Sequence, residues 1–233
     1  MKNNKTLIYT VGINYPLVEI TAPIWSIKAK ESNCDFKVIT KNHLSQIEWE
    51  HWNKYIAARV FPNYERYLFV DADTLPGNKF KIDDFFCNEH LSVCRDTLGF
   101  EWIMSSLEYF NEVIPSSAYK IDNYFNSGVI AYQKNFLPKL DDMLTYMEEN
   151  FNKINSVYLK AKEAKIGIGR DQTLLNLYSF INKWNIKYLE PHFNLQFPFF
   201  RGNIDYIVSK SVIVHFNGAH QRGLRENISK FKN

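Results

Sequence analysis

The stretch RYLFVDADTLP carries two carboxylates, Asp71 and Asp73, separated by a single alanine. They directly follow residues 66–70, whose apolar run has the length typical of a buried parallel strand. Ligands of open α/β sheets bind at the carboxyl ends of the strands, so this position favours a binding function. A turn at residues 74–77 can bring both carboxylates onto one cation, and their hard oxygens suit Mg²⁺ or Mn²⁺. The alternative is a pair of solvated turn aspartates that cap the following segment.

A third candidate metal ligand, His215, ends the apolar stretch SVIVH much later in the chain. Imidazole can complete a coordination shell that two carboxylates begin, and it shifts the preference from Mg²⁺ towards Mn²⁺. A lone histidine of this kind is more often a hydrogen-bonded core or surface residue. Beyond it, Gly218 and Gly223 would let backbone amides approach phosphate oxygens, and Arg222 or Arg225 could neutralise a leaving diphosphate.

Alternating strands and helices must position these residues. We expect strands at residues 6–12, 35–40 and 66–70, with helices at 23–31 and 48–61 between them. This βαβαβ order predicts an α/β protein with an open, mixed but mainly parallel sheet that helices flank.

The remainder of the chain continues the alternation less regularly. Further strands are expected at residues 90–94, 127–132 and 211–216, and helices at 137–151 and 170–184. Two stretches, 107–123 and 190–206, contain aromatic residues and prolines without a clear periodicity. They predict loops that lie over the sheet and shape a pocket.

Composition limits the class of the protein. The 233 residues suffice for one domain with a sizeable core, and a net charge of +3 is too small and too dispersed to indicate a nucleic-acid partner. Cys34, Cys87 and Cys94 form no C-x-x-C pair and no even set, so we expect reduced thiols in a cytoplasmic protein. No stretch approaches the roughly 18 apolar residues of a membrane span, and the N-terminal residues indicate a strand rather than a signal peptide.

Four motifs together resemble a known family. YLFVDADTLP, YFNSGVIAYQK, GRDQTLLN and VHFNGAHQRG have the order and approximate spacing of family 8 glycosyltransferases, the group of glycogenin-like enzymes and bacterial lipopolysaccharide sugar transferases. The resemblance covers about residues 6–223. It implies a single domain with the GT-A fold, which is Rossmann-like. In such a domain the nucleotide-binding half would be about residues 1–95, and the donor-sugar and acceptor half about residues 96–233.

The resemblance also implies roles for the motif residues. Asp71, Asp73 and His215 would hold a divalent ion, Mn²⁺ or Mg²⁺, against the diphosphate of a nucleotide sugar, normally a UDP-sugar. The residues implied in binding this donor are Thr10, Gly12, Tyr15, Lys54, Asp71, Ala72, Asp73, Ser127, Gly128, Gly218 and Arg222. Those implied at the reacting side of the donor sugar are Asn126, Asp171 and Gln172.

The C-terminal motif departs from the family pattern. Relatives commonly read H-x-x-G-x-x-K followed by Pro-Trp, whereas here Gln221 occupies the lysine place, Arg222 follows it and no Pro-Trp appears. If Arg222 substitutes for the lysine, it can still clamp phosphate, with the different geometry of a guanidinium fork.

The function implied is transfer of a sugar from a nucleotide sugar to a glycan, lipid-linked or protein acceptor, with retention of anomeric configuration. A different class stays open: a non-catalytic nucleotide-sugar or carbohydrate-binding protein that keeps the fold. A metal-dependent nucleotidyltransferase also pairs acids at strand ends, but no glycine-rich, basic phosphate loop follows the first strand. The mildly basic tail, residues 224–233, could contact an anionic membrane or simply fray.

Overall fold

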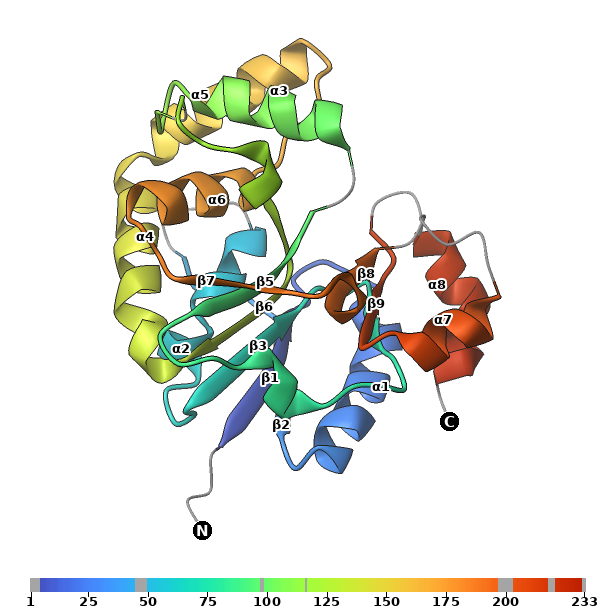
Figure 1. Cartoon of the computed structure of the whole chain (residues 1–233). Helices are drawn as coiled ribbons and strands as arrows, with labels where there is room; N and C mark the ends of the chain where they lie inside the picture. Colours follow the sequence, from blue (N-terminus) through green and yellow to red (C-terminus); the bar gives the residue numbers. More distant parts are fainter. Residues whose placement is uncertain are drawn as a thin grey trace.

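A six-stranded mixed sheet forms the centre of the computed structural model, which describes residues 5–44, 50–96, 99–115, 117–196, 203–217 and 221–231. Figure 1 shows this sheet among its helices, with a smaller sheet of three strands beside it. The strand order in the large sheet is β2-β1-β3-β6-β5-β7. The expected α/β fold with a mainly parallel sheet is confirmed.

The first three strands of the large sheet are parallel to one another. They are β1 (Thr6–Val11), β2 (Asp35–Ile39) and β3 (Arg66–Val70), and α1 (Val18–Glu31) crosses from β1 to β2. Successive side chains of a strand point to opposite faces of its sheet. In β3, Tyr67 and Phe69 belong to one core cluster, whereas Leu68 and Val70 belong to another. Both faces of β3 are therefore buried, which explains its unbroken apolar run.

The other half of the large sheet reverses direction twice. β6 (Phe125–Gln133) is antiparallel to both β3 and β5 (Leu91–Arg95), and β7 (Ile186–Leu189) is parallel to β5. β5 therefore runs in the same direction as β3. As a result, the carboxyl ends of β3 and β5 lie at the same edge of the sheet, where α/β proteins bind their ligands.

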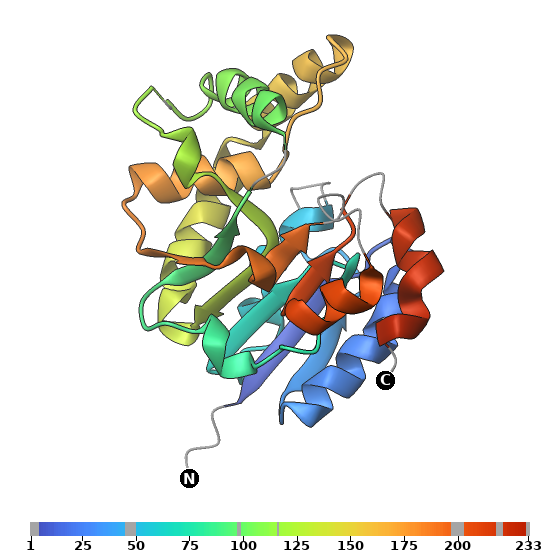
Figure 2. The ribbon, with the colours of Figure 1, turned by 45° about the vertical axis from the view of Figure 1, so that its right-hand side comes forward.

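The small sheet brings the late part of the chain to the end of β3. It consists of β4 (Thr74–Pro76), β9 (Ile213–His215) and β8 (Leu195–Gln196). β4 is antiparallel to β9, with Thr74 directly opposite His215. Figure 2 shows α7 (Ile204–Lys210) and α8 (Gln221–Asn227) close to this sheet. Their buried residues share a third core cluster with Leu75 and Val214.

Helices cover both faces of the large sheet (Figure 1). The larger core contains residues of α3 (Phe100–Phe110), α4 (Leu137–Glu149), α5 (Phe151–Glu163) and α6 (Gln172–Ile181). On the other face, α1 contributes Trp25 and Ala29. The short helices are α2 (Ala57–Val60) and the 3₁₀-helices Glu50–Tyr55, Ile82–Phe85, Ile121–Asn123, Lys134–Phe136, Pro191–Asn194 and Ile228–Phe231. Within the described ranges, no helix combines the length and the hydropathy needed to cross a membrane.

Two expected elements of the first half are wrong in detail. The helix expected at 48–61 is, in its described part, a 3₁₀-helix followed by the single turn of α2. The loop expected at 107–123 begins inside α3, which buries Ile103, Leu107 and Phe110. Residues at this spacing share one face of a helix, so the helical period was present in the sequence up to Phe110.

Two expected elements of the second half also differ. The single helix expected at 137–151 is followed by α5, which the sequence reading did not predict. α5 buries only Ile154, Val157 and Ala161 among largely polar neighbours, so its apolar pattern is weak. The loop expected at 190–206 contains a 3₁₀-helix, β8 and the start of α7.

Candidate active site

Three candidate metal ligands from distant parts of the chain converge at the end of β3. Asp71 and Asp73 follow β3, and His215 is the last residue of β9. Their ligand atoms all lie within 4.8 Å of one another. His215 Nε2 is 3.2 Å from Asp73 Oδ1 and 3.8 Å from Asp71 Oδ2. Pairing of β4 with β9 produces this convergence, because it places His215 opposite the residue that follows Asp73.

The backbone of Gly128 packs directly against the cluster. Gly128, in β6, accepts a hydrogen bond from the Asp71 amide at 2.7 Å. A Cβ on Gly128 would lie 2.4 Å from His215 Cε1 and 2.8 Å from Asp71 Oδ2, so no other residue fits there without movement. Two carboxylates and one imidazole form a donor set suited to Mn²⁺, with Mg²⁺ the harder alternative. The residues present therefore fit a divalent cation.

The electrostatic environment of His215 and Asp71 is also consistent with a cation site. Burial opposes a charge on His215, but the neighbouring Asp73 and Asp71 outweigh it and raise its pKa above the usual value. Burial raises the pKa of Asp71, Lys54 opposes this shift, and Asp73 adds to it. A divalent ion at this site would compete with the proton on His215, because a metal binds the neutral imidazole. Asn194 orients the imidazole, since its Oδ1 lies 3.0 Å from His215 Nδ1.

A buried ion pair lies next to this cluster. Lys54 Nζ is 2.8 Å from Asp171 Oδ2 and 3.7 Å from Asp71 Oδ1. The same Asp171 oxygen accepts hydrogen bonds from the Tyr55 hydroxyl at 2.9 Å and from Ser127 Oγ at 3.1 Å. Burial alone would raise the pKa of Asp171, but Lys54 and the further donors hold it well below its usual range. Asp171 is therefore ionised at neutral pH. These contacts hold its side chain, which makes no capping hydrogen bond to α6.

Gln172, the first residue of α6, is held at both ends of its amide. Its Oε1 accepts a hydrogen bond from the Ser127 amide at 3.0 Å, and its Nε2 donates to Asp96 Oδ2 at 2.7 Å. Asn126 Nδ2 also approaches Asp96 Oδ2, at 3.4 Å, and Asn126 Oδ1 accepts from Asn194 Nδ2 at 2.8 Å. The amide of Gln172 consequently has a single orientation, with little freedom left to it.

Sequence reasoning did not single out Asp96 or Asn194. Asp96 follows β5 directly, and β5 runs in the same direction as β3. The rule that pointed to Asp71, a carboxylate at the carboxyl end of a strand, would have pointed to Asp96 had the direction of β5 been known. Asn194 ends a 3₁₀-helix in a stretch expected to be a loop, and no local pattern marks it.

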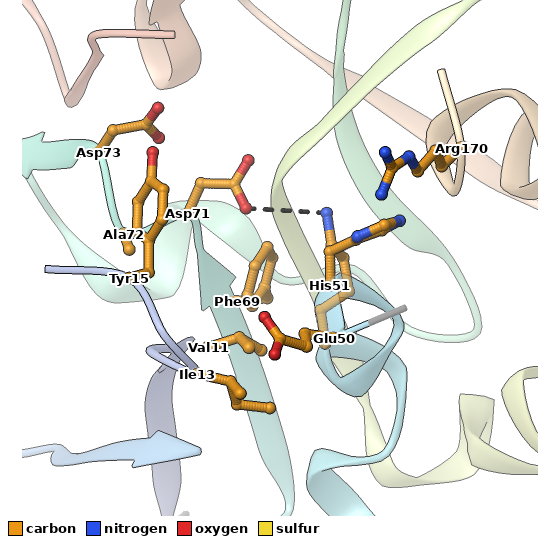
Figure 3. A pocket seen from close by; sticks show the side chains of 11 residues that line it. Val11, Ile13, Tyr15, Glu50, His51, Phe69, Asp71, Ala72, Asp73 and Arg170 are labelled. Carbon is orange, nitrogen blue, oxygen red and sulfur yellow. Dashed lines mark ion pairs between the residues drawn. The ribbon is translucent and has the colours of Figure 1, made fainter. Parts of the chain in front are cut away.

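A cavity of about 510 Å³ opens beside the two acids. Figure 3 shows Asp71, Asp73 and Tyr15 in it together with Val11 and Ile13. Its lining thus combines carboxylates with apolar and aromatic side chains. Two of the residues expected to bind the donor, Thr10 and Gly12, do not line this cavity. Thr10 points to the opposite face of β1 from Val11, and Gly12 follows the strand without a side chain.

A second cavity, of about 430 Å³, adjoins the first and shares His51, Lys54, Asp71 and Asp73 with it. Its lining also includes Asn126, Ser127, Asp171, Gln172 and His215. The expected metal ligands and the residues expected at the reacting side of the donor sugar therefore border one continuous space. Gly218 lies outside the described residues.

Comparison with protein families decides the class of the chain. A model of glycosyl transferase family 8 matches residues 20–221. The chain belongs to glycosyl transferase family 8. It is accordingly a glycosyltransferase, as the four motifs led us to expect. Comparison with curated protein sequences finds no match.

Solved structures of other glycosyltransferases share the fold. The chain is similar to a glycosyltransferase involved in glycosylation of the major capsid of PBCV-1, at 14% identity over 97% of this chain and 98% of that one, with a TM-score of 0.62. It is also similar to the galactosyltransferase LgtC in complex with donor and acceptor sugar analogues, at 11% identity over 98% and 96%, TM-score 0.56. A third similar structure is mouse xyloside xylosyltransferase 1, apo form, at 12% identity over 93% and 98%, TM-score 0.51.

In this family 8 glycosyltransferase, Gln221 rather than Arg222 faces the acid cluster. Gln221 Nε2 donates hydrogen bonds to the Tyr15 hydroxyl and, at 3.4 Å, to Asp73 Oδ2. The Arg222 side chain is 87% exposed, and its Nε donates to Glu226 Oε1 at 2.7 Å. Consecutive residues of a helix lie about 100° apart around its axis, so Arg222 points in a different direction from Gln221. The structure does not bring Arg222 to the site.

Proposed function

We propose that this glycosyltransferase moves a sugar from a nucleotide sugar, a UDP-sugar, to a glycan, lipid-linked or protein acceptor, in a reaction that needs Mn²⁺ or Mg²⁺ and retains the anomeric configuration. The observation that carries the proposal is the meeting of Asp71, Asp73 and His215 within 4.8 Å, where two cavities join. The earlier alternative of a non-catalytic binding protein has no observation in its favour.

The first cavity accommodates the nucleotide. Val11, Ile13 and Phe69 offer apolar surface to a planar base, and Tyr15 stands between that surface and Asp73. Asp71, Asp73 and His215 would hold the divalent ion, which when bound supplies Lewis-acid stabilisation of the charge that develops on the leaving diphosphate. The half of the chain up to about residue 95 supplies most of this cavity.

The second cavity accommodates the donor sugar and the acceptor. Transfer breaks the bond between the anomeric carbon and the diphosphate oxygen, and the electron pair leaves with the nucleotide. The acceptor oxygen then bonds to that carbon, and its proton passes to an oxygen of the departing diphosphate. Asp171 stays ionised beside Lys54, so it can stabilise positive charge on the sugar ring.

Gln172 and Asn126 complete the binding of the sugar. The Gln172 amide is held by the Ser127 amide and by Asp96, so it binds and shields the sugar without reorganisation. An amide is a poor nucleophile, and we therefore assign Gln172 no covalent role. Lys54, which lies between Asp71 and Asp171, links the diphosphate side of the site to the sugar side.

A panel of nucleotide sugars incubated with Mn²⁺, read for free UDP or GDP and by mass spectrometry for glycosylated product, tests the proposal. We expect release from a UDP-sugar, its loss in Asp73→Ala, and no change in Asp84→Ala, which removes an exposed aspartate that lines neither cavity. Asp73→Ala removes the carboxylate that lies 3.2 Å from buried His215, so circular dichroism checks that this variant is folded before its turnover is compared. Equal turnover by Asp73→Ala and wild type with a proven donor would refute the metal role. Tight binding of a nucleotide sugar without any turnover would indicate a binding protein instead.

A further inference from the structure

One wall of the second cavity is unused by the proposed donor chemistry. It is formed by Trp102 of α3, with Gly99 and Gly169 beside it. Trp102 does not line the first cavity, where the nucleotide base would lie. The Trp102 indole is therefore not part of the surface proposed to bind the base.

The indole of Trp102 is held in place by its surroundings. A Cβ on Gly169 would lie 2.9 Å from Trp102 Cη2 and 3.0 Å from its Cζ2, so the absence of a side chain at Gly169 gives the ring its space. The ring meets Tyr124 edge to face, with centroids 6.1 Å apart and planes at 87°. The Tyr124 hydroxyl is in turn hydrogen-bonded to Thr173 Oγ1 at 2.7 Å. A ring fixed in this way loses little entropy when a ligand covers it.

The other groups of this wall suit the edge of a sugar ring. Asp96 and Asn217 line the same cavity as Trp102, and they offer carboxylate and amide groups. A pyranose has an apolar face of C–H groups and a rim of hydroxyls, so it matches one flat aromatic ring surrounded by polar groups. A lipid chain would remove water from the polar atoms of Asp96 and Asn217 that face the cavity and offer them no hydrogen bond in return.

We propose that Trp102 is the stacking platform of the acceptor site, so that the acceptor presents a pyranose ring to this enzyme. The proposal rests on the proposed function and narrows it, since it selects a saccharide terminus over a bare lipid or peptide hydroxyl. Asp171 and Gln172 border the same cavity, so a sugar on Trp102 lies in the space where the donor's anomeric carbon reacts. Proximity of this kind is what transfer between two bound sugars requires.

Saturation-transfer NMR on the protein with Mg²⁺ and UDP tests the proposal. The probes are methyl β-galactopyranoside, methyl β-glucopyranoside, methyl α-mannopyranoside and lactose, with n-octanol and a short serine peptide as the competing acceptor classes. At least one saccharide should receive saturation, stronger on one face of its ring. Trp102→Ala should weaken its binding about tenfold or more, and Trp102→Phe, which keeps an aromatic face, should retain part of it.

Phe100→Ala is the matched control, because it removes an aromatic ring from the same helix at a position that is 65% exposed and outside the cavity. It should leave saccharide binding unchanged. The rise in melting temperature with UDP and Mg²⁺ is measured on every sample. A variant without that rise has lost its fold, and Trp102→Phe then decides in place of Trp102→Ala.

Three outcomes would overturn the proposal: no saccharide binds, saccharide binding survives in Trp102→Ala, or only octanol or the peptide depends on Trp102. Absence of a UDP-dependent shift in the wild type would instead count against the proposed function. The two failures are therefore distinguishable.

Discussion

Replacing Lys54 by methionine tests whether the buried ion pair with Asp171 stabilises the site. The Lys54 side chain is 4% exposed, and its Nζ lies 2.8 Å from Asp171 Oδ2. Removing one partner of a buried pair leaves an uncompensated charge in the interior, which costs about 3 to 5 kcal/mol. Because Tyr55 and Ser127 still donate to Asp171, we expect the lower end, a loss of about 3 kcal/mol in the free energy of unfolding near pH 7.

The pH dependence of this loss has a definite sign. In the wild type, burial favours the neutral acid, but Lys54 more than offsets it and holds the pKa of Asp171 below its unfolded value. This contribution to stability is present above the unfolded pKa and is lost as the pH falls below it. In Lys54→Met, burial acts without the ammonium group and raises the pKa of Asp171, so stability falls as the pH rises from about 4 to 7. The difference between the two proteins is therefore smaller near pH 4.

Urea unfolding followed by circular dichroism, with EDTA present to remove metal, measures both effects. Lys54→Met/Asp171→Asn leaves no unpaired charge and should recover more than half of the loss. Lys160→Met is the control, because it removes an ion pair with the same 2.8 Å separation whose side chains are both more than half exposed. We expect a change within about 0.5 kcal/mol there. An equal loss at both pH values, or a double variant no more stable than Lys54→Met, would refute the reasoning.

Three further predictions concern the ligands. Mn²⁺ and UDP together should raise the melting temperature by more than the sum of their separate shifts, because they share ligands; additive shifts in scanning fluorimetry would argue against a joint site. Gly128→Ala should weaken Mn²⁺ binding about tenfold, because its Cβ would lie 2.4 Å from His215 Cε1 and displace the imidazole. Titration calorimetry measures this affinity, and an unchanged value would contradict the packing of Gly128 against His215. Gln221→Ala should raise the KM for the nucleotide sugar, because it loses the hydrogen bond to Tyr15. Arg222→Ala should leave this KM unchanged, because its side chain is exposed. A higher KM in Arg222→Ala than in Gln221→Ala would indicate that Arg222 contacts the donor.

Local patterns in the sequence predicted β1, β2, β3, β5, β6 and β9 and the position of the first acids, but not the short strands β4, β7 and β8; residues 74–77, expected to be a turn, contain β4. The run at residues 66–70 is apolar at every position that β3 buries on its two faces, and Asp71 and Asp73 follow it directly. The βαβαβ order requires only short-range periodicity and a right-handed crossover, both of which are local properties of the chain. The three cysteines are free, as their count and spacing indicated.

Local patterns failed where an element is held by its contacts more than by its own residues. α5 has three buried positions among polar neighbours, and its helical state depends on packing against the core. The 3₁₀-helix Glu50–Tyr55 buries Lys54, whose ammonium group forms an ion pair with Asp171, the residue before α6. Neither the packing of α5 against the core nor the ion pair of Lys54 can be predicted from the hydrophobic periodicity of its own segment.

Only the tertiary structure decided which side chains share the site. His215 reaches the acids because β9 pairs with β4. Asp96 reaches Gln172 because β5 runs in the same direction as β3, which brings the residue after β5 to the same edge of the sheet. In α8, Gln221 rather than Arg222 contacts Asp73. Residue types and their order along the chain are local information. Which strand pairs with which, and which side of a helix turns inward, depends on the free energy of packing segments that are far apart in the sequence.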